Sequence, residues 1–242
     1  MKQILKNLKV LFVCALALPF VFQSCNSDGE EQLYALVSFV NTGIPGDFTA
    51  VMDNGDKIYF SDKGGYASYS PKNGQRAVIY FTQFENQVPG YKYNAKLLAV
   101  NEILTKDVIT LTDPAKDTLG NLGISFRAAS ISGGYLNIDF GVNHTADAIH
   151  YFNVVDNRLE AGDAGEADIT TDSDGYTVLE FRHKTKKEMT DMVQLVYTSA
   201  CFRLNEYNPE FTGAKGIKLK YKDYEAVNQV VVIEYKGSTA GN

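Results

Sequence analysis

Tyr135-Leu136-Asn137-Ile138-Asp139-Phe140 alternates apolar and polar side chains at every position. Successive side chains of a β-strand point to opposite faces of a sheet, so this alternation predicts a strand with one buried face. The preceding Ser132-Gly133-Gly134 favours a turn and therefore a hairpin. The same alternation recurs outward from this strand, in Thr177–Arg182 and in Ile217–Lys222. These segments together predict an all-β protein.

Nine further segments have the composition of short strands: Tyr34–Asn41, Phe48–Met52, Lys57–Ser61, Ala77–Gln83, Tyr91–Val100, Gly123–Ile131, His150–Val155, Leu195–Leu204 and Val230–Tyr235. Turn signals separate them, and Asn54-Gly55 suits a two-residue hairpin because both positions tolerate positive φ. No long helical period is present, and a short turn or helix is expected only over Lys186–Met192.

The strands divide into two groups at residues 111–121, a polar segment that contains Pro114 and Gly120 and breaks the alternation. The segment reads as a linker between units of about 80 and about 120 residues, both ordinary domain sizes. Five or six strands before it fit a small OB-like barrel over residues 32–110. Seven strands after it fit an immunoglobulin-like β-sandwich over residues 122–238.

The first 24 residues have the pattern of a secretory signal peptide. Lys2, Lys6 and Lys9 precede the apolar run Val10–Phe22, which is too short for a membrane-spanning helix of roughly 20 residues. Phe22-Gln23-Ser24-Cys25 resembles the lipobox of bacterial lipoproteins, in which the cysteine becomes the acylated N-terminus. Cys25 is therefore the expected lipidation site and membrane anchor, with plain signal cleavage as the alternative.

Residues 25–31 form a short polar tether after that cysteine. Its acidic residues resemble the surface-export signal of Bacteroidota lipoproteins, so we expect an outer-membrane lipoprotein of the cell envelope, exposed at the cell surface. Lys and Arg total 23 against 29 Asp and Glu, a net charge of -6. Removal of the three signal-peptide lysines makes the mature chain still more acidic, which argues against a nucleic-acid partner.

Few residues of the sequence suggest catalysis or metal binding. Three cysteines and three histidines exclude a cysteine-based zinc domain and a dense disulfide scaffold. Cys201 is either a nucleophile or a small buried hydrophobic residue, and its strand setting favours burial. The motifs Gly-x-Ser-x-Gly, His-Glu-x-x-His and Cys-x-x-Cys are absent. A carboxylate pair for glycoside hydrolysis depends on spatial separation, which sequence does not give. No cofactor, no metal and no enzymatic activity are expected.

Two weaker features stay open. His144 and His150 are too few for a closed zinc site, and His183 is either a base, a ligand or a packing residue at a strand end. Asp172-Ser173-Asp174-Gly175 resembles half of a calcium loop, and Asp163 and Asp168 could complete an irregular site. The alternative is a solvated hairpin loop.

Tyrosines concentrate in the first half of the chain, interleaved with lysines. OB barrels bind single-stranded nucleic acids or oligosaccharides through such aromatics. The acidic charge argues against a nucleic acid, which leaves a glycan or a peptide as the ligand. The alternative is that these tyrosines are half-buried strand residues. The candidate ligand-binding residues are Tyr59, Tyr66, Tyr69, Tyr80 and Tyr93.

Five segments, taken in order, resemble the NigD-like lipoproteins of Bacteroidota. They are Tyr34–Val37, Pro71–Ala77 with its Lys-x-Gly-Gln-Arg-like hairpin, Ile103–Lys106, Gly133–Phe140 and Leu179–His183. The resemblance implies an N-terminal OB-type barrel and a C-terminal β-sandwich, but no activity or ligand. The family takes its name from a gene near a bacteriocin. This chain departs from the family after His183, where Lys184-Thr185-Lys186-Lys187 replaces a frequent Asn.

We therefore expect a non-catalytic, lipid-anchored envelope protein that binds another envelope component, with a bacteriocin association suggested by the family name alone. The alternative is a surface lipoprotein that binds a glycan or small ligand on the tyrosine-rich face of the barrel.

Overall fold

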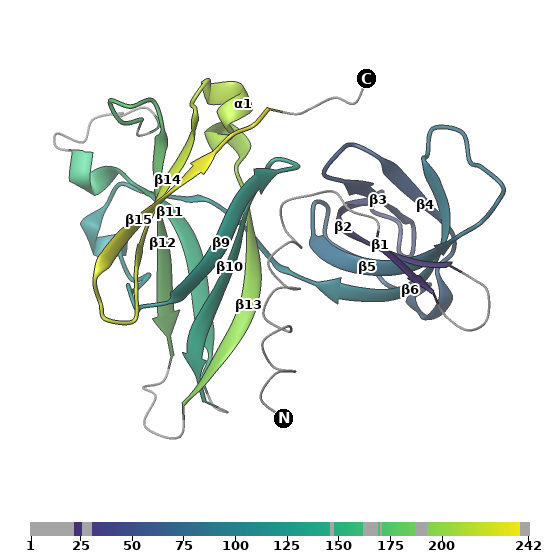
Figure 1. The fold of residues 1–242 in the computed structure, drawn as a ribbon, viewed down its shortest axis with the longest axis horizontal. Coiled ribbons are helices and arrows are strands. Elements are labelled where there is room, and N and C mark those ends of the chain that lie inside the picture. Colours follow the sequence, from purple (N-terminus) through teal and green to yellow (C-terminus); the bar gives the residue numbers. More distant parts are fainter. Residues whose placement is uncertain are drawn as a thin grey trace, which may run out of the picture. The chain divides into compact units, whose positions relative to one another are not determined.

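The computed structural model describes residues 22–25, 31–145, 148–161, 169, 171–186 and 193–237. The chain forms two compact units (Figure 1), which divide between Thr105 and Lys106. Each unit is built from β-strands around its own hydrophobic core. Short 3-10 turns and one short helix connect the strands: η2 (Gly64–Tyr66), η3 (Pro114–Lys116), η4 (Arg158–Ala161), η5 (Asn205–Tyr207) and α1 (Pro209–Thr212).

The first unit is a closed barrel. Its strands are β1 (Phe22–Cys25), β2 (Glu31–Asn41), β3 (Phe48–Met52), β4 (Lys57–Asp62), β5 (Arg76–Gln83) and β6 (Tyr93–Glu102). They follow the order β1-β2-β3-β4-β6-β5, and the extra pairing of β2 with β5 closes the ring. All pairs are antiparallel except β4 with β6. Five strands in this order form the OB-type barrel that the sequence predicts.

The barrel closes because alternate side chains of each strand point inward. In β2 the burial alternates along the strand, with Ala35, Val37 and Phe39 almost completely buried. The matching residues of β5 are Ala77, Ile79 and Phe81, which lie in the same core. Small and large side chains thus fill the interior, as expected for a narrow barrel.

The second unit is a sandwich of two sheets. One sheet has the order β7-β13-β10-β9 and the other the order β15-β14-β12-β11-β8. Figure 1 shows β9, β10 and β13 as one layer beside the layer that contains β11, β12 and β14. The strands are β7 (Leu104–Asp107), β8 (Ile109–Leu111), β9 (Ser125–Ser132), β10 (Tyr135–His144), β11 (His150–Asn157), β12 (Thr177–Thr185), β13 (Gln194–Arg203), β14 (Gly216–Lys222) and β15 (Asn228–Glu234).

The alternating segment Tyr135–Phe140 lies in β10. Leu136, Ile138 and Phe140 are fully buried between the two sheets. The ring of Phe140 packs edge-on against Phe152 and Phe181 of the opposite sheet, at 4.7 and 4.9 Å between centroids. The second sheet also contains two parallel pairs, β8 with β11 and β12 with β14, so it is not a simple antiparallel meander.

The segment 111–121, predicted as a linker, belongs to the second unit, and its expected boundary at residue 110 is therefore replaced by Thr105/Lys106. The reason is local pairing: β8 forms a parallel pair with β11 before this segment. The Leu122 amide then donates to the His183 carbonyl at 2.8 Å after it. The predicted turn or helix at 186–192 lies outside the described residues from position 187 onward.

The backbone of β1 pairs antiparallel with β2, with Cys25 opposite Glu31. Cleavage before Cys25 would remove most of β1 and leave β2 paired with β3 and β5. Among the described residues, no helix has the length and apolar character needed to span a bilayer.

Candidate functional site

Three of the five candidate tyrosines pack on the barrel core. Tyr66, Tyr69 and Tyr93 contact the buried cluster inside the barrel. The Tyr66 hydroxyl accepts a hydrogen bond from the Val100 amide at 3.2 Å. The Tyr69 hydroxyl donates to Glu102 at 2.6 Å, and burial together with that bond raises the Tyr69 pKa. The three rings, and the hydroxyls of Tyr66 and Tyr69, are thus engaged in holding the barrel.

Tyr59 and Tyr80 point away from the core, because each lies between two buried residues of its strand. The Tyr59 ring packs with Tyr91 at 5.3 Å, and the Tyr80 ring packs with Tyr34 at 5.9 Å. Opposite these tyrosines on β6 stand Asn94 and Ala99. Five residues of strand separate those positions, which is about 16 Å. The structure therefore forms two separate tyrosine pairs.

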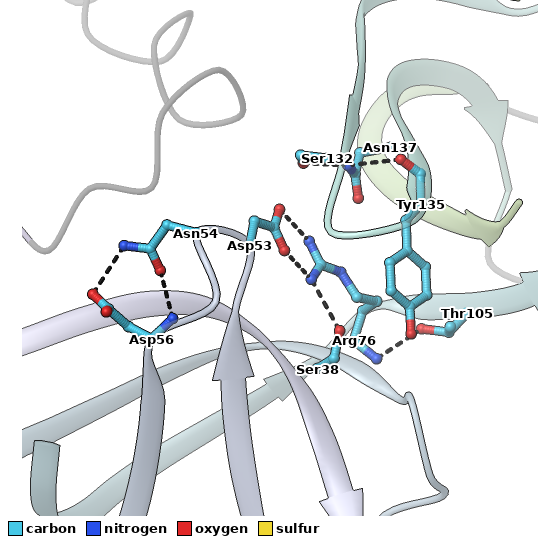
Figure 2. Close-up of polar contacts among 9 residues, drawn as sticks. All are labelled: Ser38, Asp53, Asn54, Asp56, Arg76, Thr105, Ser132, Tyr135 and Asn137. Atoms are coloured by element: carbon cyan, nitrogen blue, oxygen red, sulfur yellow. Dashed lines mark hydrogen bonds and ion pairs between the residues drawn. The ribbon is translucent and has the colours of Figure 1, made fainter. Parts of the chain in front are cut away.

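The hairpin Pro71–Ala77, singled out by the sequence, carries Arg76, which is fully buried. Its guanidinium binds both carboxylate oxygens of Asp53, at 2.5 and 2.9 Å, and also Ser38 at 3.1 Å (Figure 2). Asp53 begins the predicted Asn54-Gly55 turn, in which Gly55 adopts φ +86°. The bidentate pair satisfies the buried guanidinium and the largely buried carboxylate together, and it fixes the turn against β5.

Gln75, from the same hairpin, forms hydrogen bonds next to Arg76. The Gln75 side-chain amide donates to the Ile103 carbonyl at 2.7 Å and to the Thr105 hydroxyl at 3.2 Å. The Thr105 hydroxyl in turn accepts a hydrogen bond from the Arg76 backbone amide at 3.0 Å (Figure 2). These hydrogen bonds tie the Gln-Arg hairpin to Ile103 and Thr105 at one end of the barrel.

The segment Asp172–Gly175, which resembles half of a calcium loop, binds the ammonium group of a lysine. Lys218 of β14 reaches both Asp172 and Asp174, with Nζ–O distances of 2.5 and 2.6 Å. The Lys218 hydrogen bond lowers the pKa of Asp172, and both carboxylates raise the pKa of Lys218 to about 12. Lys215 also donates to the Asp174 carbonyl at 2.8 Å. Asp163 and Asp168 lie outside the described residues.

The three histidines of the chain form one row, although they come from β10, β11 and β12. His144 Nδ1 lies 3.1 Å from His150 Nε2, and His150 Nδ1 lies 2.9 Å from His183 Nε2. His183 Nδ1 ends the row 3.3 Å from the Gly123 carbonyl oxygen. His150 and His183 stack on Phe152 of the sandwich core.

The Gly123 carbonyl sets the tautomers of the row. A carbonyl can only accept, so His183 carries its proton on Nδ1 and offers Nε2 as an acceptor to His150 Nδ1–H. Because neutral His150 carries its proton on Nδ1, its Nε2 can only accept a hydrogen bond. His144 therefore carries its proton on Nδ1 and donates it to His150 Nε2. Burial lowers the pKa of His183 to about 4, and burial with the neighbouring His144 lowers the pKa of His150.

His183 is thus a packing histidine, 2% exposed, and Cys201 is the buried hydrophobic residue that its strand setting favours. The ring nitrogens of the row face each other in pairs and do not converge on one point. Within the described ranges, no group of three or more His, Cys, Asp or Glu side chains is arranged to hold a metal ion. Near the start of β10, the Asn137 side chain donates to Ser132 at 3.0 Å across the hairpin turn (Figure 2).

The sequence does not predict a cavity of about 500 Å³ in the second unit, on the outer face of β11 and β12. Its lining includes three lysines, a tyrosine and two other polar side chains: Lys106, Lys184, Lys186, Tyr151, Asn153 and Thr118. Tyr151 and Lys184 are direct cross-strand neighbours. The only signal in the sequence is the lysine-rich departure after His183, which could not be connected with Lys106 without the sheet register.

Several solved structures have this fold. A protein described as toxin-related from Parabacteroides distasonis has a TM-score of 0.66 and 24% identity, covering 86% of this chain and 96% of that one. A NigD-like immunity protein from Bacteroides caccae has a TM-score of 0.55 and 20% identity, with coverage of 81% and 90%. A protein described as a lipoprotein from Bacteroides fragilis has a TM-score of 0.55 and 15% identity, with coverage of 85% and 98%. These identities show the fold alone.

No match was found among curated proteins. Two family models match the chain in order. Residues 41–103 match the NigD-like N-terminal OB domain, and residues 107–235 match the NigD-like C-terminal β-sandwich domain. Together they cover the barrel from the end of β2 onward and nearly all of the sandwich, and the second alone spans more than half of the sequence. The chain therefore belongs to the NigD-like family.

Proposed function

We propose that this chain is a non-catalytic, lipid-anchored protein of the cell envelope that binds another envelope component. The observation that carries the proposal is that charged and titratable groups of the described motifs are engaged in internal contacts. Arg76 binds Asp53, Lys218 lies between two aspartates, and His183 is buried on Gly123. Such groups stabilise the two β units, and surface recognition is the activity that this arrangement supports.

Anchoring rests on the lipobox-like Phe22–Cys25 and on the likeness to a protein described as a lipoprotein. Acylation of Cys25 with more than one chain would give stable membrane attachment. The acidic tether supports export to the outer surface. The name of the Bacteroides caccae structure adds support for an interaction role related to immunity against a bacteriocin, at the level of fold only.

Crosslinking in living cells tests the proposal, with mass spectrometry of the proteins captured by the full chain. One dominant protein partner, lost in a Cys25→Ala variant that still folds, is the expected result. Cell fractionation checks the anchor separately, because Cys25→Ala should move the protein from the membrane to the soluble fraction. Equal capture by anchored and unanchored protein would contradict an anchored interaction role. Protease treatment of intact cells tests surface exposure, which complete protection would contradict.

A second candidate function is glycan binding on the barrel. The Tyr59–Tyr91 pair supports it, because two half-exposed rings at 5.3 Å offer a stacking surface for a sugar ring. Purified protein is screened against a glycan panel by thermal shift. Tyr59→Ala should abolish the shift, and Tyr80→Ala, which alters the other outward pair, should not. A shift that is insensitive to Tyr59→Ala would remove this candidate.

A further inference from the structure

We propose that the cavity on the outer face of β11 and β12 binds an acidic sugar, a saccharide unit that carries a carboxylate or a phosphate. The site comprises Lys106, Lys184, Lys186, Tyr151, Asn153 and Thr118. All six residues lie in the second unit, so the site is complete within the sandwich. The inference does not depend on an envelope partner or on the tyrosines of the barrel.

Charge is the first argument. The other ion pairs of the sandwich bring lysines or arginines to carboxylates, as in Lys218 with Asp172 and Arg203 with Asp107. Among the described residues, no carboxylate forms an ion pair with any of the three cavity lysines. Three uncompensated cations around one hollow attract an anion even though the whole chain carries a net charge of -6.

Among the described residues, two carboxylates near the cavity are drawn to an arginine. Asp117 and Glu180 flank the cavity segment and β12, and both face the same arginine. Arg182 lies 2.6 Å from Glu180 and 3.8 Å from Asp117. Asn157 donates a further hydrogen bond to Glu180 at 3.1 Å. These contacts draw both acids toward Arg182, and the three lysines together with Arg182 still outnumber the two carboxylates.

Two of the ammonium groups are held in position by neutral oxygens. Lys106 Nζ donates to the Phe152 carbonyl at 3.0 Å and to Asn153 Oδ1 at 2.7 Å. Lys184 Nζ donates to the Thr118 carbonyl at 2.9 Å. An ammonium group has three donors, so both keep at least one N–H for a ligand oxygen. Burial lowers the pKa of Lys106, and a bound anion would reverse that effect.

Shape and ring chemistry argue for a sugar rather than a bare anion. A volume of about 500 Å³ is in the range of small-molecule sites and far exceeds that of a single phosphate. Tyr151 is 43% exposed and stands beside Lys184 across the strands, so its ring can pack on a sugar face. Asn153 and Thr118 add polar groups to the lining, which suit sugar hydroxyls.

The test is isothermal titration of the purified, detergent-solubilised full chain with glucuronate, with glucose 6-phosphate and with glucose. Glucuronate or glucose 6-phosphate should bind saturably, whereas glucose should not. The double variant Lys184→Gln/Lys186→Gln should weaken that binding about tenfold or more, since charge-assisted hydrogen bonds are lost. The matched control is Lys72→Gln/Lys92→Gln, which makes the same change in net charge with exposed lysines of the barrel.

A lipid-borne source of the same chemistry is distinguished by a second arm. Phosphatidylcholine vesicles with and without phosphatidylinositol are offered to the Cys25→Ala chain, which lacks the anchor. Phosphatidylinositol-dependent binding that Lys184→Gln/Lys186→Gln abolishes supports a lipid headgroup as the acidic sugar. The proposal is overturned if neither arm shows saturable binding, if glucose binds as well as the acidic sugars, or if both double variants lose affinity equally. Crosslinking of an envelope partner is unaffected by these outcomes.

Discussion

Acid should weaken the sandwich through His183, the buried inner end of the histidine row. His183 is 2% exposed, and its Nε2 accepts the proton of His150 Nδ1 at 2.9 Å. A second proton on His183 would place two N–H groups against each other inside the core. The folded state therefore resists protonation of His183, whereas the unfolded chain does not.

The magnitude follows from the pKa difference. The His183 pKa falls from 6.5 to about 4 in the folded chain. A depressed histidine pKa means that the unfolded state binds more protons, so the free energy of unfolding decreases as pH falls through 6.5 towards 4. Between pH 7 and pH 5 the loss is about 2 kcal/mol from this residue alone. The lowered pKa of His150 acts in the same direction.

The assay is urea unfolding at pH 7 and pH 5, read by hydrogen exchange of separate peptides and corrected for the intrinsic effect of pH on exchange. Peptides of β12 report on the sandwich, and peptides of the barrel are an internal control because all three histidines lie in the sandwich. At pH 5 most carboxylates are still ionised, which isolates the histidines.

Two variants separate His183 from the rest of the row. His183→Gln should remove most of the pH dependence, because glutamine does not titrate. His144→Gln alters the outer end of the row and should leave the contribution of His183. The reasoning is refuted if wild type and His183→Gln lose the same stability between pH 7 and pH 5, or if the sandwich becomes more stable in acid.

Three further predictions follow from the described contacts. Arg76→Met should lower the stability of the barrel by about 3–5 kcal/mol in chemical denaturation, because it leaves Asp53, whose side chain is only 13% exposed, without its guanidinium; a loss below about 1 kcal/mol would contradict the pair. Calcium should produce no shift in the melting temperature of the wild-type chain, because Lys218 occupies the place between its two aspartates; a clear shift would contradict that arrangement. Tyr69→Ala should cost about 2 kcal/mol or more and Tyr59→Ala less than about 1 kcal/mol, and equal losses would contradict their different orientations.

Strand positions were predictable because burial alternates with a period of two, which is visible in the sequence. Phe48–Met52 is predicted residue for residue, and Leu136, Ile138 and Phe140 are buried as expected. The unit boundary was less accessible. The segment 111–121 is polar and contains Pro114, yet its neighbour β8 pairs with β11, and such long-range pairing leaves no local signal.

The candidate sites were predicted less well than the strands. Tyr59 and Tyr69 look alike in the sequence, but the first faces outward and the second packs edge-on against Phe39. Asp172 and Asp174 resemble a calcium loop because the sequence does not show that Lys218, more than forty residues away, reaches both carboxylates. In each case a partner distant in sequence decides the role.

Local pattern alone determined that the chain is all-β and acidic, and it predicts a lipobox-like leader, because periodicity, charge and short motifs are properties of neighbouring residues. Only the tertiary structure decided which side chains meet. Sheet register brings His150 beside His183 and Tyr151 beside Lys184, and packing of the two sheets adds His144 to the row. Register depends on pairing between distant strands, and a shift by one residue would turn each of these side chains to the opposite face of its sheet.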